Sequence, residues 1–518
     1  MTPAAPRYSD ARRRSGGASG SWSSGCGGQS SSGSNASSVR VAIEATAARA
    51  RSGSHRVAVS HSCASGSTSW LMSGPAVLIR VSSLRERARL RGACADARRR
   101  PPHAGPRNPT AGFERLSSWA RMATFSTRFL GCKVSFADAQ AIRERLLADG
   151  HLEVAEGGEI QVVNTCCVTH EAVSKSRQAA SRASRAARAV YVTGCAANLE
   201  GAFAGAPPNV VVTRRTGDEA AAFVASHVGP IGCVDAQHGL DRVRAFVKIQ
   251  DGCSFSCAFC VIPLVRGATR SRNAGAVLGE IRRRVAQGHR EIVLTGVNLG
   301  CFRDRAAGYT LAGLVREAGA TPGVERLRLS SIEVNHVDDD LVAALLETPT
   351  VSPHLHVPLQ SGDDSVLHAM GRRYTTAQFE RRLAPLAGLN LTTDVIVGFP
   401  AEDDAGFERT LGLVERLGMT KVHVFPYSPR PGTRTAAEDA VAPEVKRDRA
   451  ARLRALSDDL CRRRWLRRVG SFDRVLVDRP GRGYADDYTP WLVEGEVGAF
   501  VAARAVGVAA EGVLAVAA

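Results

Sequence analysis

Apolar and polar positions alternate with two different periods from residue 122 onward, and the changes of period mark the predicted elements. Short apolar runs rich in β-branched residues predict strands, and the amphipathic stretches between them predict helices. In the first block the predicted strands are residues 127–134, 160–169, 189–198 and 209–215, and the predicted helices are 137–150 and 171–188. This alternation predicts a parallel sheet with helices on both faces.

The strand-and-helix pattern then repeats six times between residues 243 and 435. The predicted strands are 244–250, 291–297, 326–332, 354–360, 391–399 and 421–427, and the helices between them include 276–288, 339–348, 376–388 and 405–418. Six repeats fit an open partial (β/α)6 barrel better than the complete eight-repeat barrel, which typically takes ~250 residues. The active site of such a barrel lies at the carboxyl ends of its strands.

The last part of the chain begins with a basic helical segment at residues 444–470. Short strand-like runs and glycines follow it from 471 to 518, which predicts a small antiparallel barrel. We therefore predict an α/β protein with three folded domains, at 122–237, 238–450 and 451–518, the last including the basic helix. A run of arginines like the one in this helix is more often a solvated face than a binding site.

Residues 1–121 have a different composition, rich in serine, glycine, alanine and arginine. They contain 19 arginines, no lysine and 5 acidic residues, a net charge of +14 out of the chain's +18. Such a stretch buries too little apolar surface to fold, so we expect a disordered extension. An organelle transit segment and translation from a wrongly chosen upstream start both fit it. We favour the second, with Met122 as the natural beginning, because the stretch is long and shows no clear amphipathic helix.

The remaining 397 residues carry a net charge of only +4, so the overall charge does not by itself indicate a nucleic-acid-binding protein. The apolar run at residues 70–81 is too short to span a bilayer, and so is every other apolar run. We therefore expect a soluble, cytoplasmic protein with no membrane partner.

Thirteen cysteines in a chain without a secretory signal argue for metal binding or catalysis rather than for disulfides. Cys132, the pair Cys166 and Cys167, and Cys195 each fall near the end of one of the first three predicted strands. The carboxyl ends of parallel strands share one edge of the sheet, where ligands bind. A metal site at this edge and three small buried side chains are both open interpretations.

Cys253, Cys257 and Cys260 form a C-x3-C-x2-C loop directly after the first strand of the predicted barrel. An iron–sulfur cluster normally takes four protein thiolates, so three leave one iron with an open coordination position. S-adenosylmethionine can fill that position through its amino and carboxylate groups, and electron transfer then releases a 5′-deoxyadenosyl radical. A structural zinc site is the alternative, weakened because no fourth ligand lies nearby in the sequence.

With Phe259 before its last cysteine, this loop resembles that of the radical S-adenosylmethionine superfamily. The wider motifs resemble the methylthiotransferases, and they stand in the family's order at residues 129–135, 162–178, 192–195, 247–272, 355–374, 393–402 and 425–436. The resemblance extends from Thr124 to the C-terminus. It implies the three domains predicted above, the last being an RNA-binding TRAM domain, which is the weakest match.

The resemblance implies two [4Fe–4S] clusters and S-adenosylmethionine as cofactors. An auxiliary cluster that carries the sulfur would be held by Cys132, Cys166 and Cys195, and the radical-generating cluster by Cys253, Cys257 and Cys260. Cys166 is preferred to Cys167, since neighbouring residues of a strand point to opposite faces and only one of the two should be a ligand. One S-adenosylmethionine would methylate sulfur, and a second would yield the radical that removes hydrogen from an unactivated C–H bond.

Several residues at the predicted mouth of the barrel are candidates for contact with S-adenosylmethionine. They are Phe259, Gly296, Val297, Asn298, Asp394 and Glu402, with Gly398 close by in sequence. Ordinary turn chemistry accounts equally well for glycine and aspartate at such positions.

Three substrate classes occur in the family that the motifs resemble: isopentenyladenosine in tRNA, threonylcarbamoyladenosine in tRNA, and an aspartate of a ribosomal protein. The motifs "LGCKVS", "NTCCVT" and "KSRQ" most resemble those of the enzymes that act on threonylcarbamoyladenosine, although Ser135 stands where the family usually has asparagine. The predicted reaction adds a methylthio group to carbon 2 of the modified adenosine next to the anticodon. That base lies in a single-stranded loop, from which it can be splayed out.

The predicted partners are the anticodon stem-loop of tRNA and an electron donor such as flavodoxin or ferredoxin, and the sequence does not indicate the sulfur donor. The basic helix and the C-terminal barrel are candidates for phosphate contacts. The alternatives are the other two methylthiotransferase substrates, and a non-catalytic RNA-binding protein with structural metal clusters, for which each metal site would have four ligands.

Overall fold

The computed structural model of the chain describes residues 122–231 and 242–518. The predicted extension at 1–121 and the predicted domain boundary after residue 237 lie outside the described residues. Within the described part of the chain, no helix is long and apolar enough to cross a membrane.

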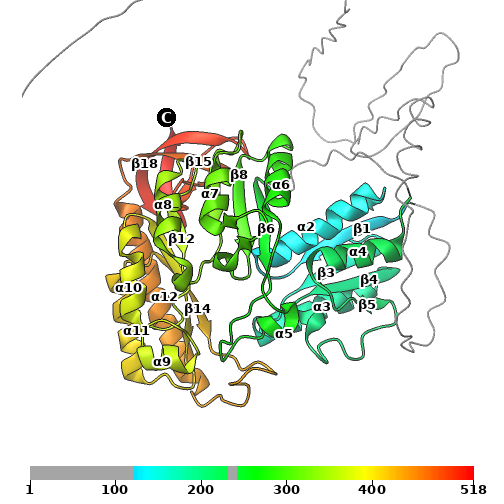
Figure 1. Cartoon of the computed structure of the whole chain (residues 1–518), viewed down its shortest axis with the longest axis horizontal. Coiled ribbons are helices and arrows are strands. Elements are labelled where there is room, and N and C mark those ends of the chain that lie inside the picture. Colours follow the sequence, from blue (N-terminus) through cyan, green and yellow to red (C-terminus); the bar gives the residue numbers. More distant parts are fainter. Residues whose placement is uncertain (1–121, 232–241) are drawn as a thin grey trace, which may run out of the picture. The chain divides into compact units, whose positions relative to one another are not determined.

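The first described part is a five-stranded sheet with the order β2-β1-β3-β4-β5, in which all neighbours are parallel (Figure 1). Its strands are β1 (Thr124–Phe129), β2 (Leu152–Glu153), β3 (Ile160–Thr165), β4 (Ala189–Gly194) and β5 (Val210–Val212), and its helices are α2 (Lys133–Ala148), α3 (His170–Ser184) and α4 (Gly217–Val228). One face packs against apolar residues of α2 and α4 and the other against those of α3. The predicted parallel sheet with helices on both faces is confirmed.

The start of α2 differs from the prediction. The strand predicted through residue 134 ends at Phe129, and α2 begins at Lys133. Gly131 has a φ of +138°, which turns the chain out of the strand, and Cys132 is the extended N-cap residue of α2. The apolar alternation continues past the true strand end, because Leu130 and Val134 are also apolar, and this misled the prediction.

The next part holds six parallel strands in the order β6-β8-β11 and β12-β13-β14, joined by an isolated parallel bridge between Leu327 and Val351. Its strands are β6 (Arg244–Asp251), β8 (Glu291–Gly296), β11 (Arg326–Leu329), β12 (His354–His356), β13 (Asn390–Val397) and β14 (Lys421–Pro426), with the short β7 (Arg270–Ser271) antiparallel at the edge. The helices are α5 (Ile262–Arg266), α6 (Ala274–Ala286), α7 (Leu311–Gly319), α8 (Asp339–Glu347), α9 (Asp364–Ala369), α10 (Thr376–Leu383) and α11 (Asp404–Arg416).

This arrangement confirms the partial (β/α)6 barrel. Its apolar strands and the inner faces of its helices form the largest core cluster of the described residues. A small ribbon of β9 (Arg303–Asp304) and β10 (Tyr309–Thr310) precedes α7, a helix that the sequence analysis did not single out.

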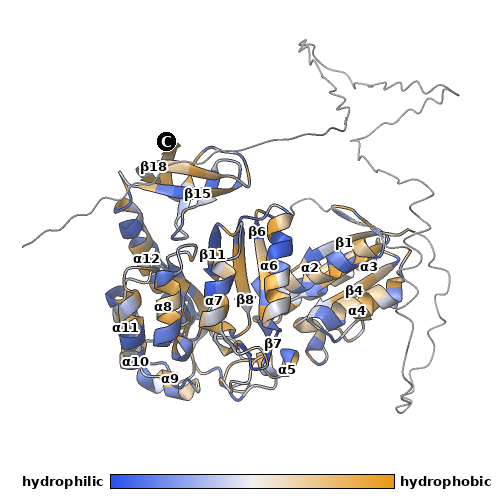
Figure 2. Ribbon diagram, turned by 45° about the horizontal axis from the view of Figure 1, so that its top comes forward, coloured by the Kyte–Doolittle hydropathy of each residue, from blue (hydrophilic) through white to orange (hydrophobic). Residues whose placement is uncertain are grey.

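The third part is α12 (Pro443–Leu466), largely hydrophilic in Figure 2, followed by a closed five-stranded barrel. The barrel order is β15-β16-β17-β19-β18, with strands β15 (Phe472–Arg479), β16 (Arg482–Tyr484), β17 (Pro490–Leu492), β18 (Phe500–Ala509) and β19 (Gly512–Ala517). Trp491 fills its core. The predicted small antiparallel barrel is confirmed, with one parallel pair: β17 and β19 run parallel, and this pair helps to close the barrel.

A buried charge network joins the C-terminal barrel to the partial barrel. Glu291 accepts hydrogen bonds from Arg326 Nε at 2.6 Å and from Arg328 Nε at 2.8 Å. Arg326 Nη1 reaches Asp486 at 2.9 Å, and Arg328 Nη2 donates to the carbonyl of Ala485 at 3.0 Å. Glu291 therefore orients the two guanidinium groups that contact the loop between β16 and β17.

We expect Glu291→Gln to lower the free energy of unfolding by about 3–5 kcal/mol, because two buried guanidinium groups then lack a carboxylate. Burial alone would raise the pKa of Glu291, but Arg328 and Arg326 bring it below its ordinary value. The carboxylate thus stabilises the fold above about pH 4, and this contribution is lost as the pH falls further. Denaturant unfolding at neutral and acidic pH measures both effects.

Glu347→Gln, at an exposed position that ends α8, is the matched control and should change the free energy of unfolding by no more than about 0.5 kcal/mol. Equal losses for the two variants would show that the network does not hold the two barrels together.

Candidate active site

A cavity of about 1430 Å³ is lined by residues of the first sheet, the partial barrel and the C-terminal barrel. All six cysteines predicted as cluster ligands line it: Cys132, Cys166, Cys195, Cys253, Cys257 and Cys260. Of the predicted cofactor contacts, it is also lined by Phe259, Gly296, Val297, Asn298 and Asp394. Residues from elements far apart in sequence therefore meet in one space, as the prediction of a single active site requires.

The first cysteine trio lies at one edge of the N-terminal sheet. Cys132 precedes α2, Cys166 directly follows β3, and Cys195 directly follows β4. Gly131 lies against Cys166, since a Cβ at Gly131 would be 3.3 Å from the Cβ of Cys166. Burial raises the pKa of the Cys166 thiol to about 11, with neighbouring Cys195 and Cys132 adding to the effect.

Cys166 and its neighbour Cys167 have different surroundings. Cys166 lines the cavity, whereas Cys167 is fully buried among Val173, Ala202 and Val261. A hydrogen bond with Cys195, together with burial, raises the pKa of Cys167, and the same bond lowers the pKa of Cys195, with Arg266 acting in the same direction. The two cysteines thus point to different sides, with Cys166 on the side of the cavity.

Arg266, at the end of α5, connects this trio to the second one. Its Nε donates to Cys195 Sγ at 3.1 Å, its Nη1 to Asp251 at 2.7 Å and its Nη2 to Asp138 at 2.7 Å. Its side chain is only 1% exposed and that of Asp138 is 0% exposed, so these charges are shielded from water. Lys248 adds a second cation between Asp138 and Asp251.

The second cysteine trio lies in the loop after β6, which closes back on itself. The backbone N–H of Cys253 donates to the carbonyl of Gly267 at 3.0 Å. Gly252 has a φ of +68°, and a Cβ there would be 2.1 Å from the carbonyl oxygen of Ala268, so this position requires glycine. Arg372 Nη1 donates to Cys257 Sγ at 3.3 Å, which places a cation beside the loop.

Neither cysteine trio is compact enough for a single metal ion. Two thiolates on one zinc ion, with Zn–S bonds of about 2.3 Å, lie no more than about 4.6 Å apart. Among the described residues, the one group of three or more possible ligands within 4.8 Å of one another is His356, Asp394 and His423. Neither cysteine trio meets this limit, which disfavours the zinc alternative.

The cavity wall beside the second trio carries polar atoms that have no partner in the described residues. They are Thr295 Oγ1, Asn298 Oδ1 and Ser330 Oγ, all buried. The backbone of Asn298 is held by Gln250 Oε1, which accepts its N–H at 2.8 Å. A ligand with amino, carboxylate and hydroxyl groups, such as S-adenosylmethionine, would satisfy the atoms of Thr295 and Asn298, since buried polar groups are normally hydrogen-bonded.

Glu402 was expected among the cofactor contacts, but the structure does not bring it to the cavity. Its carboxylate accepts hydrogen bonds from the N–H of Gly398 and from Arg449 Nη1 of α12, the latter at 2.8 Å. Glu402 therefore joins the β13 loop to α12, and Gly398 packs against Lys446 of the same helix. Position near a strand end was not enough to predict which way this side chain points.

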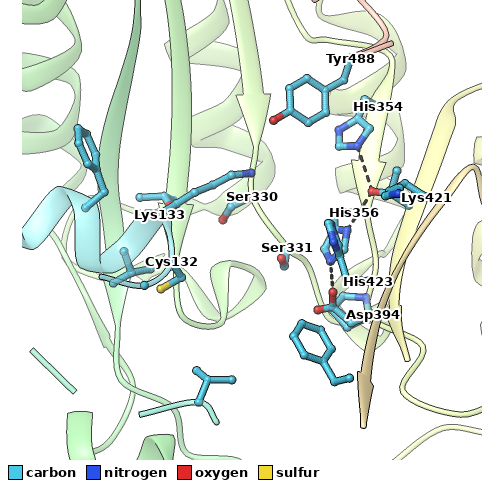
Figure 3. A pocket seen from close by; sticks show the side chains of 18 of the residues that line it. Cys132, Lys133, Ser330, Ser331, His354, His356, Asp394, Lys421, His423 and Tyr488 are labelled. Atoms are coloured by element: carbon cyan, nitrogen blue, oxygen red, sulfur yellow. Dashed lines mark hydrogen bonds and ion pairs between the residues drawn. The ribbon is translucent and has the colours of Figure 1, made fainter. Parts of the chain in front are cut away.

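The wall opposite the first trio is polar (Figure 3). His356 lies 3.2 Å from Asp394 through its Nε2, and its Nδ1 lies 2.9 Å from the hydroxyl of Thr392, which is also 3.1 Å from His354 Nε2. Burial lowers the pKa of His354 and of His423. These imidazoles are therefore mainly neutral at physiological pH and are able to accept as well as donate hydrogen bonds.

Sequence reasoning missed several of these residues. Arg266 stands in the apolar run "VIPLVRG", and a lone arginine in such a run is a signal for a buried charge. His354 and His356 alternate in "HLHV", which places both on one face of the strand. Lys133, which directly follows the predicted ligand Cys132, also lines the cavity and was not singled out.

The comparisons with known proteins agree with this geometry. Residues 247–414 match the radical SAM superfamily, and residues 124–212 match an uncharacterised protein family, UPF0004. The chain is 34% identical over 423 residues to the threonylcarbamoyladenosine tRNA methylthiotransferase MtaB of Thermotoga maritima, covering 76% of this chain and 96% of that protein. It is 37% identical over 368 residues to MtaB of Bacillus subtilis, and the match covers 66% of this chain and 82% of that protein.

A relative with a different printed substrate also matches. The tRNA-2-methylthio-N(6)-dimethylallyladenosine synthase of Sphingopyxis alaskensis is 31% identical over 402 residues, covering 71% of this chain and 90% of that protein. The fold and the cysteine loop thus define a radical S-adenosylmethionine enzyme. Within that class the chain belongs to the methylthiotransferase family, as its identity with these relatives over most of their length shows. Such an enzyme binds S-adenosylmethionine and a [4Fe–4S] cluster.

We expect Arg266→Met to lower the free energy of unfolding by about 3–5 kcal/mol, because Asp138 and Asp251 would then share only Lys248. Arg266→Lys should lower the free energy of unfolding by less, since lysine keeps the positive charge but lacks the forked donors of the guanidinium group. Denaturant unfolding measures the change.

Arg282→Met, on the exposed side of α6, is the control for loss of an arginine and should leave the free energy of unfolding almost unchanged. If Arg266→Met were as stable as this control, the three-way contact of Arg266 would not be a structural link.

Proposed function

We propose that this protein converts threonylcarbamoyladenosine next to the anticodon of tRNA into its 2-methylthio derivative. The observation that carries the proposal is the convergence of two cysteine trios, from two different domains, on one cavity. A structural role would favour four ligands at each site, whereas each trio leaves room for a further ligand. The match to MtaB proteins over most of their length supports the threonylcarbamoyladenosine substrate.

We assign Cys253, Cys257 and Cys260 to the radical-generating [4Fe–4S] cluster, and Cys132, Cys166 and Cys195 to an auxiliary [4Fe–4S] cluster. When bound, these groups supply the one-electron cleavage of S-adenosylmethionine and the sulfur to be transferred. Phe259, Gly296, Val297, Asn298 and Asp394 would hold S-adenosylmethionine at the cavity wall. Glu402 is withdrawn from this set because of its contacts with α12.

The protein's own residues would bind, orient and shield the reactants. Arg372 places positive charge beside Cys257, and Arg266 does the same beside Cys195. The hydrogen bond from Cys167 and the charge of Arg266 lower the pKa of Cys195, which favours its thiolate form. The polar wall of His354, His356 and Asp394 offers donors and acceptors to a nucleobase. Walls from three parts of the chain surround the reactants.

The tRNA would contact α12 and the C-terminal barrel. Arg449, Arg452, Arg463, Arg464 and Arg468 form ion pairs within the protein. Among the described residues, four exposed arginines of this segment have no such partner and are available to phosphates: Arg447, Arg454, Arg462 and Arg467. Arg462 also lines the cavity, which connects this basic face to the site. Reduced flavodoxin or ferredoxin is the proposed electron donor.

Two other substrates compete within the same chemistry. The match to a dimethylallyladenosine synthase keeps the isopentenyl-type base as a candidate. Methylthiolation of a ribosomal protein is a further alternative, and an RNA-binding protein with structural clusters is the non-enzymatic one.

The direct test is mass spectrometry of tRNA nucleosides from cells with and without the gene. Loss of 2-methylthio-threonylcarbamoyladenosine, with accumulation of its precursor, is the expected result. Loss of the isopentenyl analogue would keep the chemistry and change the substrate. An unchanged tRNA profile would reject the tRNA assignment and direct the same measurement to ribosomal proteins.

We expect Cys166→Ala to lose about half of the bound iron, from about eight to about four atoms per chain, because one of two four-iron clusters lacks a ligand. Cys167→Ala should keep the full iron content, since Cys167 faces the core. Iron and sulfide analysis of the anaerobically reconstituted full chain makes the comparison.

Cys301→Ala provides a control, because this thiol lies 3.4 Å from His336 and outside the cavity lining. The reverse pattern, with iron lost only from Cys167→Ala, would assign Cys167 as the ligand. Equal iron in all three variants would remove the auxiliary cluster from the proposal.

A further inference from the structure

Lys133 is a cation in an unfavourable place. It is the first residue of α2, and the first turn of this helix contains no acidic residue. The N-terminus of a helix carries partial positive charge, so a lysine there is disfavoured and an acidic residue is preferred. Local helix stability therefore does not account for this lysine.

The Lys133 side chain lines the cavity without a partner. Among the described residues it takes part in no ion pair and no hydrogen bond. Five other cations that line the same cavity do have acidic partners: Arg244 with Asp478, Arg266 with Asp138, Arg372 with Glu333, Lys421 with Asp458 and Arg464 with Asp487. Arg462, which also lines it, is exposed at the surface of α12. The cavity thus holds an ammonium group whose counter-ion is not supplied by these neighbours.

Two hydroxyl groups face the same space (Figure 3). Ser330 is 4% exposed, and its Oγ has no hydrogen-bond partner in the described residues. Tyr488 accepts a hydrogen bond from Arg244 at 3.3 Å through its hydroxyl oxygen, which leaves its own proton free to donate. An ammonium group, two hydroxyl donors and a helix N-terminus together favour an anion with several acceptor oxygens.

We propose that Lys133, with Ser330 and Tyr488, binds the carboxylate of the threonyl group of the substrate. The inference rests on the proposed function and deepens it. Threonylcarbamoyladenosine carries a free carboxylate on its N6 substituent, whereas the isopentenyl substituent is neutral and apolar. A half-buried ammonium group without an acidic partner therefore discriminates between the two bases by charge.

The position of Lys133 agrees with the geometry of the base. Carbon 2 and N6 lie on the same edge of adenine, separated by N1, so the N6 substituent extends along the edge that receives sulfur. Lys133 follows Cys132 directly and thus lies beside the proposed sulfur-carrying site. When carbon 2 faces that site, the threonyl group lies within the part of the cavity that Lys133 lines.

Two other anions share this chemistry, namely the carboxylate of S-adenosylmethionine and the RNA phosphates. A test must therefore change the threonyl carboxylate alone. The probe is an anticodon stem-loop RNA containing threonylcarbamoyladenosine, compared with the same RNA in which the threonyl carboxylate is a methyl ester. Single-turnover methylthiolation and RNA binding are measured for the wild type, Lys133→Met, Lys133→Arg and Lys421→Met holoenzymes.

The wild type is expected to prefer the acid over the ester by roughly 10- to 100-fold, the range for hydrogen bonds to a charged group. Lys133→Met should lose this preference by weakening only the reaction and binding of the acid, and Lys133→Arg should restore part of it. Lys421→Met, which removes a cavity lysine that already has an acidic partner, should keep the preference. Reductive cleavage of S-adenosylmethionine without RNA should be unchanged in Lys133→Met.

Each other outcome overturns the inference. Equal weakening of acid and ester in Lys133→Met would assign Lys133 to RNA phosphates. Loss of S-adenosylmethionine cleavage without RNA would assign it to that cofactor, and an unchanged preference would leave it no role in recognition. A wild type that does not modify the acid-containing RNA at all would instead reject the proposed function, which separates the two failures.

Discussion

The arrangement of the active site depends on the single guanidinium group of Arg266. Its three nitrogen atoms donate to Asp138 of α2, to Asp251 at the end of β6 and to the sulfur of Cys195 after β4. Asp138 and Asp251 both carry negative charge and would repel one another without the cations that they share, Arg266 and Lys248. Because Asp251 lies two residues before Cys253, the same contacts set the distance between the two cysteine trios. A buried ion group of this kind adds more to positional specificity than to stability, since desolvation offsets much of the attraction.

The period of the apolar residues was enough to predict the parallel sheet, the six-repeat barrel and the small terminal barrel. It was also enough to place Cys166, Cys195 and Cys253 near strand ends, because the carboxyl ends of parallel strands meet at one edge. The structure also brings both sets of cysteines to one cavity, which the strand-end argument by itself does not predict. Local patterns succeeded here because each depends only on neighbouring residues.

Features that depend on distant partners were not predictable in the same way. Arg266 is separated from Asp138 by 128 positions and from Cys195 by 71, so no local pattern could pair them. Glu402 was misplaced for the same reason, since its partner Arg449 lies 47 positions away. Lys133 and Ser330 form one wall only after α2 approaches the barrel. The strand predicted through residue 134 failed for a local reason, the positive φ of Gly131 within an apolar run.

The sequence separation of the cysteines has a consequence for the order of maturation. Cys253, Cys257 and Cys260 lie within one short loop, so even a nascent chain can present them together at a small loss of chain entropy. Cys132, Cys166 and Cys195 come together only when β1, β3 and β4 have paired. With the ligand sets proposed above, insertion of the auxiliary cluster would be a late step that reports on completed folding. A chain with a defective N-terminal sheet would then retain a radical-generating centre without its sulfur-carrying counterpart.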